Sequence, residues 1–218
     1  MKKKTVFFLV LLTLLVLIEG IANAQTYVDL GLPSGTLWAD RNVGALSPED
    51  YGDYFAWGET TTKSNYILST LKYCEDSDGE KFSKYNTQSK YGSVDNKTNL
   101  ERTDDAATAN WGSDWCMPKL QQFKELKDNC TWTWTTHNGK NGYEVKGING
   151  NSLFLPAAGH RYGIELYDAD SDGYYGSSLL DTEDPDGELG LYISSGVINP
   201  GNWFGRNFGV SVRPVRCR

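Results

Sequence analysis

The sequence MPKLQQFKELKDNCTWTWTTHNGKNGYEV, residues 117–145, contains a helix pattern followed directly by a strand pattern. Leu120, Phe123 and Leu126 recur at the spacing of one helix face. Pro118 suits the first turn of a helix, where its missing N–H costs nothing. We therefore predict a helix that begins near Pro118 and ends near Asn129, with one apolar face turned to the core.

Strands are predicted after this helix. Threonine and tryptophan alternate strictly over residues 131–135, and the turn 138–142 fits a hairpin between this run and residues 143–145. Residues 152–156 form a further apolar run. These patterns predict a group of antiparallel strands that follows the helix along the chain.

The sequence before the helix also contains strand patterns. Alternation over residues 28–32 leads through the turn 33–35 into residues 36–39, which predicts a hairpin, and residues 52–58 predict an aromatic strand. Residues 60–99 are polar with little periodicity, which predicts a long surface excursion.

A second helix and a terminal strand complete the order of elements. Asp104 and Asp105 precede a run of alanine and threonine, which favours a helix N-terminus. Residues 209–215 predict a terminal strand. The order of strands, two helices, then strands and loops predicts the α+β class.

The N-terminus predicts export. Three lysines precede the apolar residues 6–18, and small residues lead to Ala24, which is the order of a signal peptide cleaved after Ala24. A membrane anchor is the alternative, but the apolar run is shorter than the ~20 residues of a spanning helix. We expect residues 25–218 to form a single domain without a transmembrane segment, located in the periplasm, at the cell surface or outside the cell.

Charge excludes one class of partner. The whole chain has a formal charge of −7, and residues 1–24 carry three lysines and one glutamate, so the remainder has a charge of −9. Such a surface repels phosphate backbones, and neither nucleic acid nor an anionic membrane is expected as a partner.

Four cysteines remain after the signal peptide: Cys74, Cys116, Cys130 and Cys217. An even number in an exported chain favours disulfides over catalysis. Three pairings are possible, and the sequence alone does not choose among them. Our working hypothesis pairs Cys74 with Cys130 and Cys116 with Cys217, which would tie the chain end to the middle.

Six ordered blocks that span nearly the whole mature chain carry a family resemblance. They are YVDLGLPSGTLW (27–38), GDYFAWGE (52–59), WGSDWCMP (111–118), NCTWTW (129–134), FLPAAG (154–159) and SVRPV (211–215). Together they resemble the Fibrobacter succinogenes major paralogous domain, a family abundant in exported proteins of gut Bacteroidota.

The resemblance implies a C-type lectin-like fold with two helices, short antiparallel strands and a long loop region. That fold is distantly shared with the formylglycine-generating enzymes and the variable ligand-binding proteins of diversity-generating retroelements. In it the first and last strands lie side by side, and the loop region, about residues 160–207, would carry recognition. Trp111, Trp115, Pro118 and Leu120 would hold the frame. This is reasoning from a fold and demonstrates no activity.

The sequence departs from the family pattern at two positions. Cys116 stands where arginine is usual, which supports a bond between Cys116 and Cys217. Gly176 stands where tryptophan is common, which puts the usual shape of the loop in question.

Aromatic residues crowd the predicted recognition region. They are Tyr162, Tyr167, Tyr174, Tyr175, Tyr192, Trp203, Phe204 and Phe208. Tyrosine and tryptophan are favoured in recognition loops, although about half of these side chains would fill the core beneath. We expect Tyr174, Tyr175 and Trp203 to be exposed and to bind the ligand together with Asp184, Asp186 and Arg206.

Two acidic patterns suggest calcium without satisfying its requirements. Asp168, Asp170 and Asp172 copy the first half of a calcium loop, but Leu179 stands where the loop needs a bidentate acid. A site of another geometry would recruit Glu183, Asp184, Asp186 or Glu188. Asp184-Pro185-Asp186 is similar to the triplet that holds sugar hydroxyls in calcium-dependent lectins, but the partner Trp-Asn-Asp triplet is missing. A solvated acidic loop is favoured, so we predict no cofactor and leave calcium open.

Catalysis has little support. His137 and His160 are the only histidines, and the common hydrolase and phosphate-loop motifs are missing from the sequence. A formylglycine-generating enzyme needs a reactive cysteine pair late in the chain, where only Cys217 stands. We expect a non-catalytic module that binds a glycan or an extracellular protein. The alternatives are a structural or adhesion subunit of the cell surface and, less favoured, a hydrolase, which would show buried carboxylates with shifted pKa.

Overall fold

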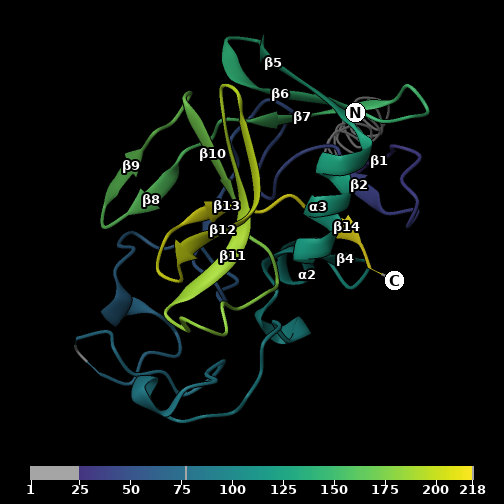
Figure 1. Ribbon diagram of the computed structural model, residues 1–218. Helices are drawn as coiled ribbons and strands as arrows, with labels where there is room; N and C mark the ends of the chain where they lie inside the picture. Colours follow the sequence, from purple (N-terminus) through teal and green to yellow (C-terminus); the bar gives the residue numbers. More distant parts are fainter. Residues whose placement is uncertain (1–24, 77, 218) are drawn as a thin grey trace, which may run out of the picture.

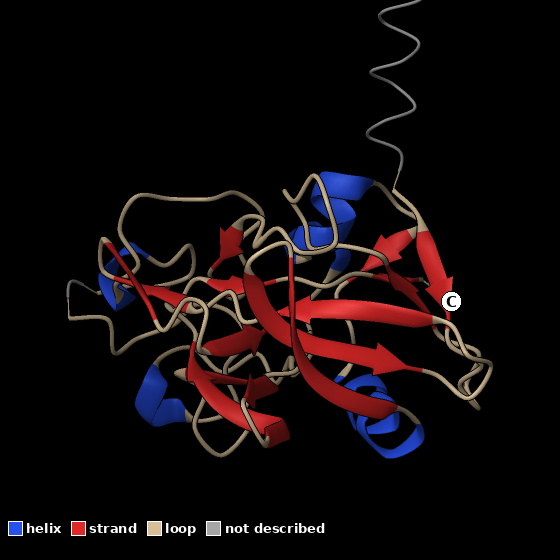
Figure 2. Ribbon diagram, turned by 90° about the horizontal axis from the view of Figure 1, so that it is seen from above, coloured by secondary structure: helices blue, strands red, loops and turns tan. Residues whose placement is uncertain are grey.

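The computed structural model describes residues 25–76 and 78–217. Its described part has the α+β architecture expected from the sequence, with helices α2 (Ala106–Trp111) and α3 (Leu120–Asn129) and four sheets. Of the strand pairs in these sheets, β10 with β13 is parallel and the others are antiparallel. Strands occupy the centre of the molecule and helices its margins (Figure 2). The predicted signal peptide lies outside the described residues.

The first sheet joins the two ends of the described chain. It runs in the order β1 (Tyr27–Asp29), β2 (Leu37–Ala39), β14 (Val215–Arg216) and β4 (Trp115–Cys116). The predicted N-terminal hairpin is therefore present, and the last strand lies beside its second arm (Figure 1).

One of the two hypothetical disulfides is confirmed and the other is wrong. Cys116 is bonded to Cys217, with 5.4 Å between their Cα atoms, and this bond ties the chain end to β4. Cys74 and Cys130 are free thiols. They cannot pair because they pack against different hydrophobic clusters, Cys74 beside Phe82 and Cys130 at the end of α3. Burial raises the pKa of the Cys130 thiol to about 11, so it is protonated at neutral pH.

Both helices follow from local sequence signals. The carboxylate of Asp105 accepts the backbone N–H of Thr108 at 2.9 Å and caps α2. In α3, Leu120, Phe123 and Leu126 are buried as their spacing predicts. Pro118 lies before this helix rather than in its first turn, and its carbonyl accepts the N–H of Ser178 at 2.9 Å.

Three antiparallel strands follow α3 at the top of Figure 1: β5 (Thr131–His137), β6 (Lys140–Lys146) and β7 (Ser152–Pro156). The turn between β5 and β6 is shorter than the predicted 138–142. Asn138 and Gly139 alone make it, with φ values of 46° and 80°. A two-residue turn with positive φ at both positions matches the twist of the two strands, so both strands extend farther toward the turn.

The central sheet has five strands in the order β12-β11-β10-β13-β3. They are β12 (Val197–Gly205), β11 (Gly187–Ser194), β10 (Asp172–Tyr175), β13 (Val210–Ser211) and β3 (Tyr54–Phe55). The predicted terminal strand 209–215 is split between this sheet and the first. The buried guanidinium of Arg213 lies at the crossing and donates to Asn42 Oδ1 and to the carbonyls of Ala39, Asp40 and Phe154.

The polar segment 60–99 is only partly the surface excursion that was predicted. It contains the 3-10 helices η1 (Leu68–Thr70) and η2 (Ser89–Tyr91), and a third, η3 (Arg102–Asp104), follows it. Tyr66, Phe82 and Tyr85 are buried in it. The buried carboxylate of Asp104 accepts Lys72 Nζ at 2.8 Å and the Tyr73 hydroxyl at 2.7 Å, and these contacts hold the segment against the domain.

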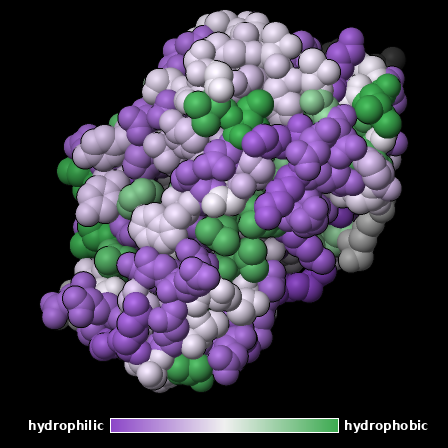
Figure 3. Space-filling model, in the orientation of Figure 1, coloured by the Kyte–Doolittle hydropathy of each residue, from purple (hydrophilic) through white to green (hydrophobic). Residues whose placement is uncertain are grey.

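The remaining sheet is the hairpin of β8 (His160–Tyr162) and β9 (Glu165–Tyr167). Within the described ranges, no helix has the length and apolar character needed to cross a membrane. The face of the molecule shown in Figure 3 carries small, separate groups of hydrophobic residues among hydrophilic ones.

Candidate functional site

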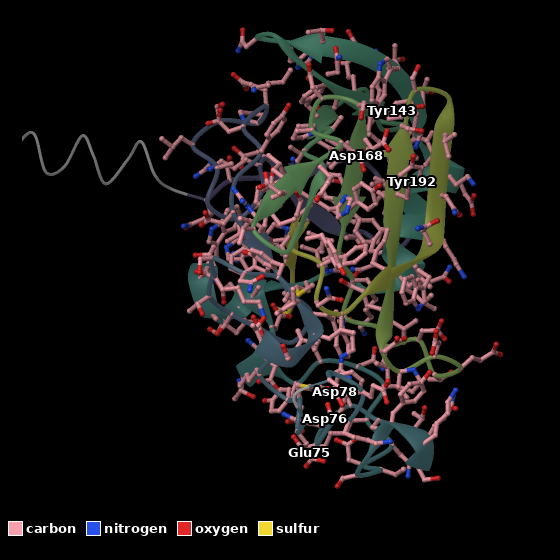
Figure 4. All side chains as sticks on the ribbon, turned by 90° about the vertical axis from the view of Figure 1, so that its left-hand side faces the viewer. Glu75, Asp76, Asp78, Tyr143, Asp168 and Tyr192 are labelled. Atoms are coloured by element: carbon pink, nitrogen blue, oxygen red, sulfur yellow. A yellow bond between two sulfur atoms is a disulfide. The ribbon has the colours of Figure 1, made fainter. Side chains whose placement is uncertain are left out.

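A hollow of about 510 Å³ lies where the polar segment, β8 and the end of β12 meet. Its walls include Leu68, Asp78, Tyr162, Asp186, Trp203 and Phe208. Half of these residues, Tyr162, Asp186 and Trp203, belong to the region 160–207 that was expected to carry recognition. Asp78 comes from the polar segment, and Figure 4 shows it beside Glu75 and Asp76 at the end of the molecule opposite Tyr143. We call this space the main hollow.

Two half-exposed aromatic side chains border the main hollow. Trp203 is 42% exposed and Tyr162 is 49% exposed. The indole of Trp203 lies directly over Gly187 on the neighbouring strand, where a Cβ would stand 2.0 Å from the indole nitrogen. The glycine therefore lets the indole lie flat against the strand with part of its surface open to a ligand.

Asp186 gives the main hollow an acceptor. Its side chain is partly exposed and lines the hollow, whereas its Oδ1 atom is buried. Burial and, secondly, the negative charge of Asp184 raise the pKa of the Asp186 carboxyl to about 6. At neutral pH the group is ionised, so the part of the carboxylate that lines the hollow can accept a hydrogen bond from a ligand hydroxyl.

A smaller hollow of about 220 Å³ adjoins the first and shares Tyr162 and Phe208 with it. The ring of His160 stacks on Phe208 at 5.0 Å and on Tyr167 at 5.7 Å between centroids. Burial lowers the pKa of His160, so the ring is neutral at neutral pH. The two hollows thus form one aromatic surface bordered by carboxylates.

The expected exposure of three aromatic residues is only partly correct. Trp203 is exposed and lines the main hollow, and Tyr174 is half-buried with its hydroxyl donating to Asp168 at 3.1 Å. The prediction that Tyr175 is exposed is wrong, because its side chain is 0% exposed and its hydroxyl donates to the carbonyl of Pro156. Tyr174 and Tyr175 are neighbours on β10, so they point to opposite faces and one must enter the core.

Arg206 is buried, although it was expected to bind the ligand. Its side chain is 1% exposed, lies over the ring of Phe82 at 4.3 Å, and donates to the carbonyls of Lys84, Tyr85 and Pro185. Burial lowers its pKa to about 10, so it remains charged at neutral pH. The guanidinium holds the polar segment to the loop before β11, and Arg206 does not line the main hollow.

The predicted acidic residues do not converge on one point, although Asp184 lies close enough to Asp186 to raise its pKa. Asp184 accepts a hydrogen bond from the Tyr91 hydroxyl. Asp168 accepts from Tyr174, Asp170 from the backbone N–H of Asn141, and Asp172 from the Tyr192 hydroxyl. Figure 4 shows Asp168 and Tyr192 in the half of the molecule away from Asp78. Residues 25–76 and 78–217 contain no group of three or more His, Cys, Asp or Glu side chains arranged to hold a metal ion.

Glu188 is a buried carboxyl that the sequence did not distinguish from its acidic neighbours. It is 0% exposed, and burial raises its pKa to about 8. A Cβ at Gly176 would lie 3.2 Å from both Glu188 Oε2 and Met117 Cε, so the tryptophan common in the resembled family has no room here. Asp186 does not contribute to the pKa of Glu188, and Glu188 does not line the main hollow. Asp186 and Glu188 therefore do not lie in one site.

Sequence reasoning missed the contribution of the polar segment to the main hollow. Ile67 and Leu68 are adjacent aliphatic residues in this otherwise polar segment, and both line the hollow. That pair was the available signal. Its place beside Trp203 depends on the pairing of Tyr66 with Gly163, which no local pattern reveals.

No protein-family model, curated protein sequence or solved structure matches this chain.

Proposed function

We propose that the protein is an exported, non-catalytic module that binds a glycan through the main hollow. We further propose that it has a C-type lectin-like fold and belongs to the Fibrobacter succinogenes major paralogous domain family, as the six sequence blocks suggest. The observation that carries the functional proposal is that the open indole of Trp203 and the carboxylate of Asp186 line the same hollow.

Sugar recognition requires both kinds of group. An aromatic ring offers a flat apolar face to the C–H groups of a sugar ring, and a carboxylate accepts its hydroxyls. The main hollow holds both, and its volume of about 510 Å³ lies within the range of ordinary ligand sites. A protein partner is the alternative ligand, but a concave space lined by an aromatic ring and a carboxylate fits a small polyol better than a flat protein surface.

Replacement of Trp203 by alanine should weaken glycan binding about thirtyfold, because a buried tryptophan contact is worth about 2 kcal/mol. The experiment is a glycan array probed with the wild type and Trp203→Ala, followed by calorimetry on the best glycan. Tyr27→Ala is the matched control, since Tyr27 is 55% exposed on β1 and does not line the main hollow.

Each array should also be run with calcium and with a chelator. We expect binding to persist under chelation, because Trp203 and Asp186 act without a metal in this account. Binding that disappears with the chelator, or that is equal in wild type and Trp203→Ala, would contradict the proposed site. Silence for all glycans in every arm would turn the search to protein ligands.

A further inference from the structure

A polar pocket of about 330 Å³ lies on the other side of β8 from the main hollow. It is lined by Asp53, Tyr54, Lys63, Tyr66 and Arg161, among others. Side chains alternate along a strand, so Arg161 points away from the face that carries His160 and Tyr162. The two sites are therefore neighbours that share a strand and are lined by different side chains.

Arg161 differs from the other arginines in the described ranges. Each of the others donates to an oxygen of the protein: Arg41, Arg102, Arg206, Arg213 and Arg216. The guanidinium of Arg161 has no hydrogen bond or ion pair with any described residue and lies over the ring of Tyr54, 5.2 Å from its centroid. Stacking on an aromatic face orients the guanidinium and leaves its N–H edge available.

None of the other charged groups among the described pocket residues forms an ion pair with Arg161. Lys63 Nζ is engaged by Glu59 Oε1 at 2.8 Å and by the carbonyl of Thr70 at 3.1 Å. Asp53 is exposed, and its carboxylate makes no hydrogen bond or ion pair with a described residue. The positive charge of Arg161 lowers the pKa of the Tyr66 phenol and the negative charge of Asp53 raises it, although burial is the larger effect, so both charges lie near this phenol.

The pocket therefore offers one free guanidinium and one free carboxylate. A guanidinium presents parallel N–H donors that match the two oxygens of a carboxylate, and a carboxylate accepts hydrogen bonds from hydroxyls. In a protein with a formal charge of −7, an unpaired cation facing a polar pocket provides local complementarity to an anion.

We propose that this pocket binds a hydroxylated carboxylate of the uronic acid type, with its carboxylate on Arg161 and a hydroxyl donating to Asp53. The ligand is either a free sugar acid or an acidic residue of a glycan, because both present the same group. The site is distinct from the main hollow, and the inference does not depend on the function proposed for that hollow.

The test is calorimetric titration of the protein with glucuronate and with glucose, which differ at the carboxylate. Glucuronate should bind and glucose should bind at least about tenfold more weakly, since a hydrogen-bonded charge pair is lost. Arg161→Gln should weaken glucuronate binding by a similar factor. Arg216→Gln removes the same charge from an arginine paired with Asp114 and should leave the affinity unchanged.

Equal affinities for glucuronate and glucose in the wild type would overturn the proposal without reference to any variant. An Arg161→Gln protein that is folded and binds glucuronate as tightly as wild type would also overturn it. Tighter binding of a glucuronate-containing disaccharide than of glucuronate would identify a glycan as the source. Equal binding of the two would identify the free acid.

Trp203→Ala separates this pocket from the main hollow. It should weaken the glycan binding proposed for the main hollow about thirtyfold and leave the affinity for glucuronate as it is in the wild type. If glycan binding fails in the wild type but glucuronate binding depends on Arg161, only the function proposed for the main hollow falls.

Discussion

Between about pH 5 and pH 8, the free energy of unfolding of the wild type is expected to fall as the pH rises. In the Glu188→Gln protein this fall should be absent from the contribution of residue 188. The folded wild type holds the carboxyl of Glu188 protonated up to its pKa of about 8, whereas in the unfolded chain it ionises near 4.5. Between these values the folded protein binds one proton more than the unfolded chain, so the free energy of unfolding falls as the pH rises and levels off above about pH 8.

The expected slope is about 1.4 kcal/mol per pH unit for one proton. Glutamine has the shape of the protonated carboxyl and can still accept the N–H of Ser177, which Glu188 Oε2 accepts at 3.2 Å. Its amide does not ionise, so this contribution to the slope disappears.

The measurement is urea unfolding of both proteins at a series of pH values from 5 to 9. Other shifted groups, such as Asp186, contribute equally to both proteins, so the difference between the two curves isolates Glu188. Parallel curves would show that Glu188 ionises normally in the folded protein and would contradict its assigned burial.

The second large effect is expected from Arg206→Met, which should lower the free energy of unfolding by about 3–5 kcal/mol. Methionine fills part of the same volume but leaves the carbonyls of Lys84, Tyr85 and Pro185 without their donor. Buried acceptors that lose their partners carry the full cost of desolvation.

Denaturant unfolding of Arg206→Met should be compared with that of Arg216→Met, which removes a half-exposed surface arginine and should change stability by less than about 1 kcal/mol. Folded Arg206→Met should bind glycan as the wild type does. Unchanged stability together with lost binding would return Arg206 to the ligand site, against the structure.

The parts of the fold that were predictable depend on neighbours along the chain. The apolar spacing of Leu120, Phe123 and Leu126 defines α3, and the acidic cap at Asp105 defines the start of α2. The alternation of residues 131–135 defines β5, and Asn138 with Gly139 supplies the turn that follows. Such signals act within a few residues and remain readable without the structure.

The features that were mispredicted depend on contacts between distant segments. The last apolar run is split between two sheets at Arg213. Its guanidinium donates hydrogen bonds to Asn42 and Phe154, which are far away in the sequence. The buried guanidinium of Arg206 donates hydrogen bonds to the carbonyls of residues 84, 85 and 185, which stabilise it in the core. A buried and an exposed arginine look alike in a sequence.

The candidate site shows the same division. Aromatic richness drew attention to the region that contains the exposed Trp203, but the strand alternation that buries Tyr175 required the exact register of β10. Ile67 and Leu68 join the main hollow through the bridge between Tyr66 and Gly163. Composition therefore pointed to one of the segments that line the main hollow, and long-range pairing determined which side chains line it.

The indole N–H signals of the seven tryptophans offer the most direct test of the central claim, that the main hollow binds a glycan. The protein labelled with nitrogen-15 would be titrated with the best glycan from the array, and the Trp203 signal would be assigned by its loss in Trp203→Ala. The account predicts that the Trp203 signal shifts in proportion to bound glycan while those of the buried Trp38 and Trp57 stay in place. A stationary Trp203 signal under saturating glycan would contradict it.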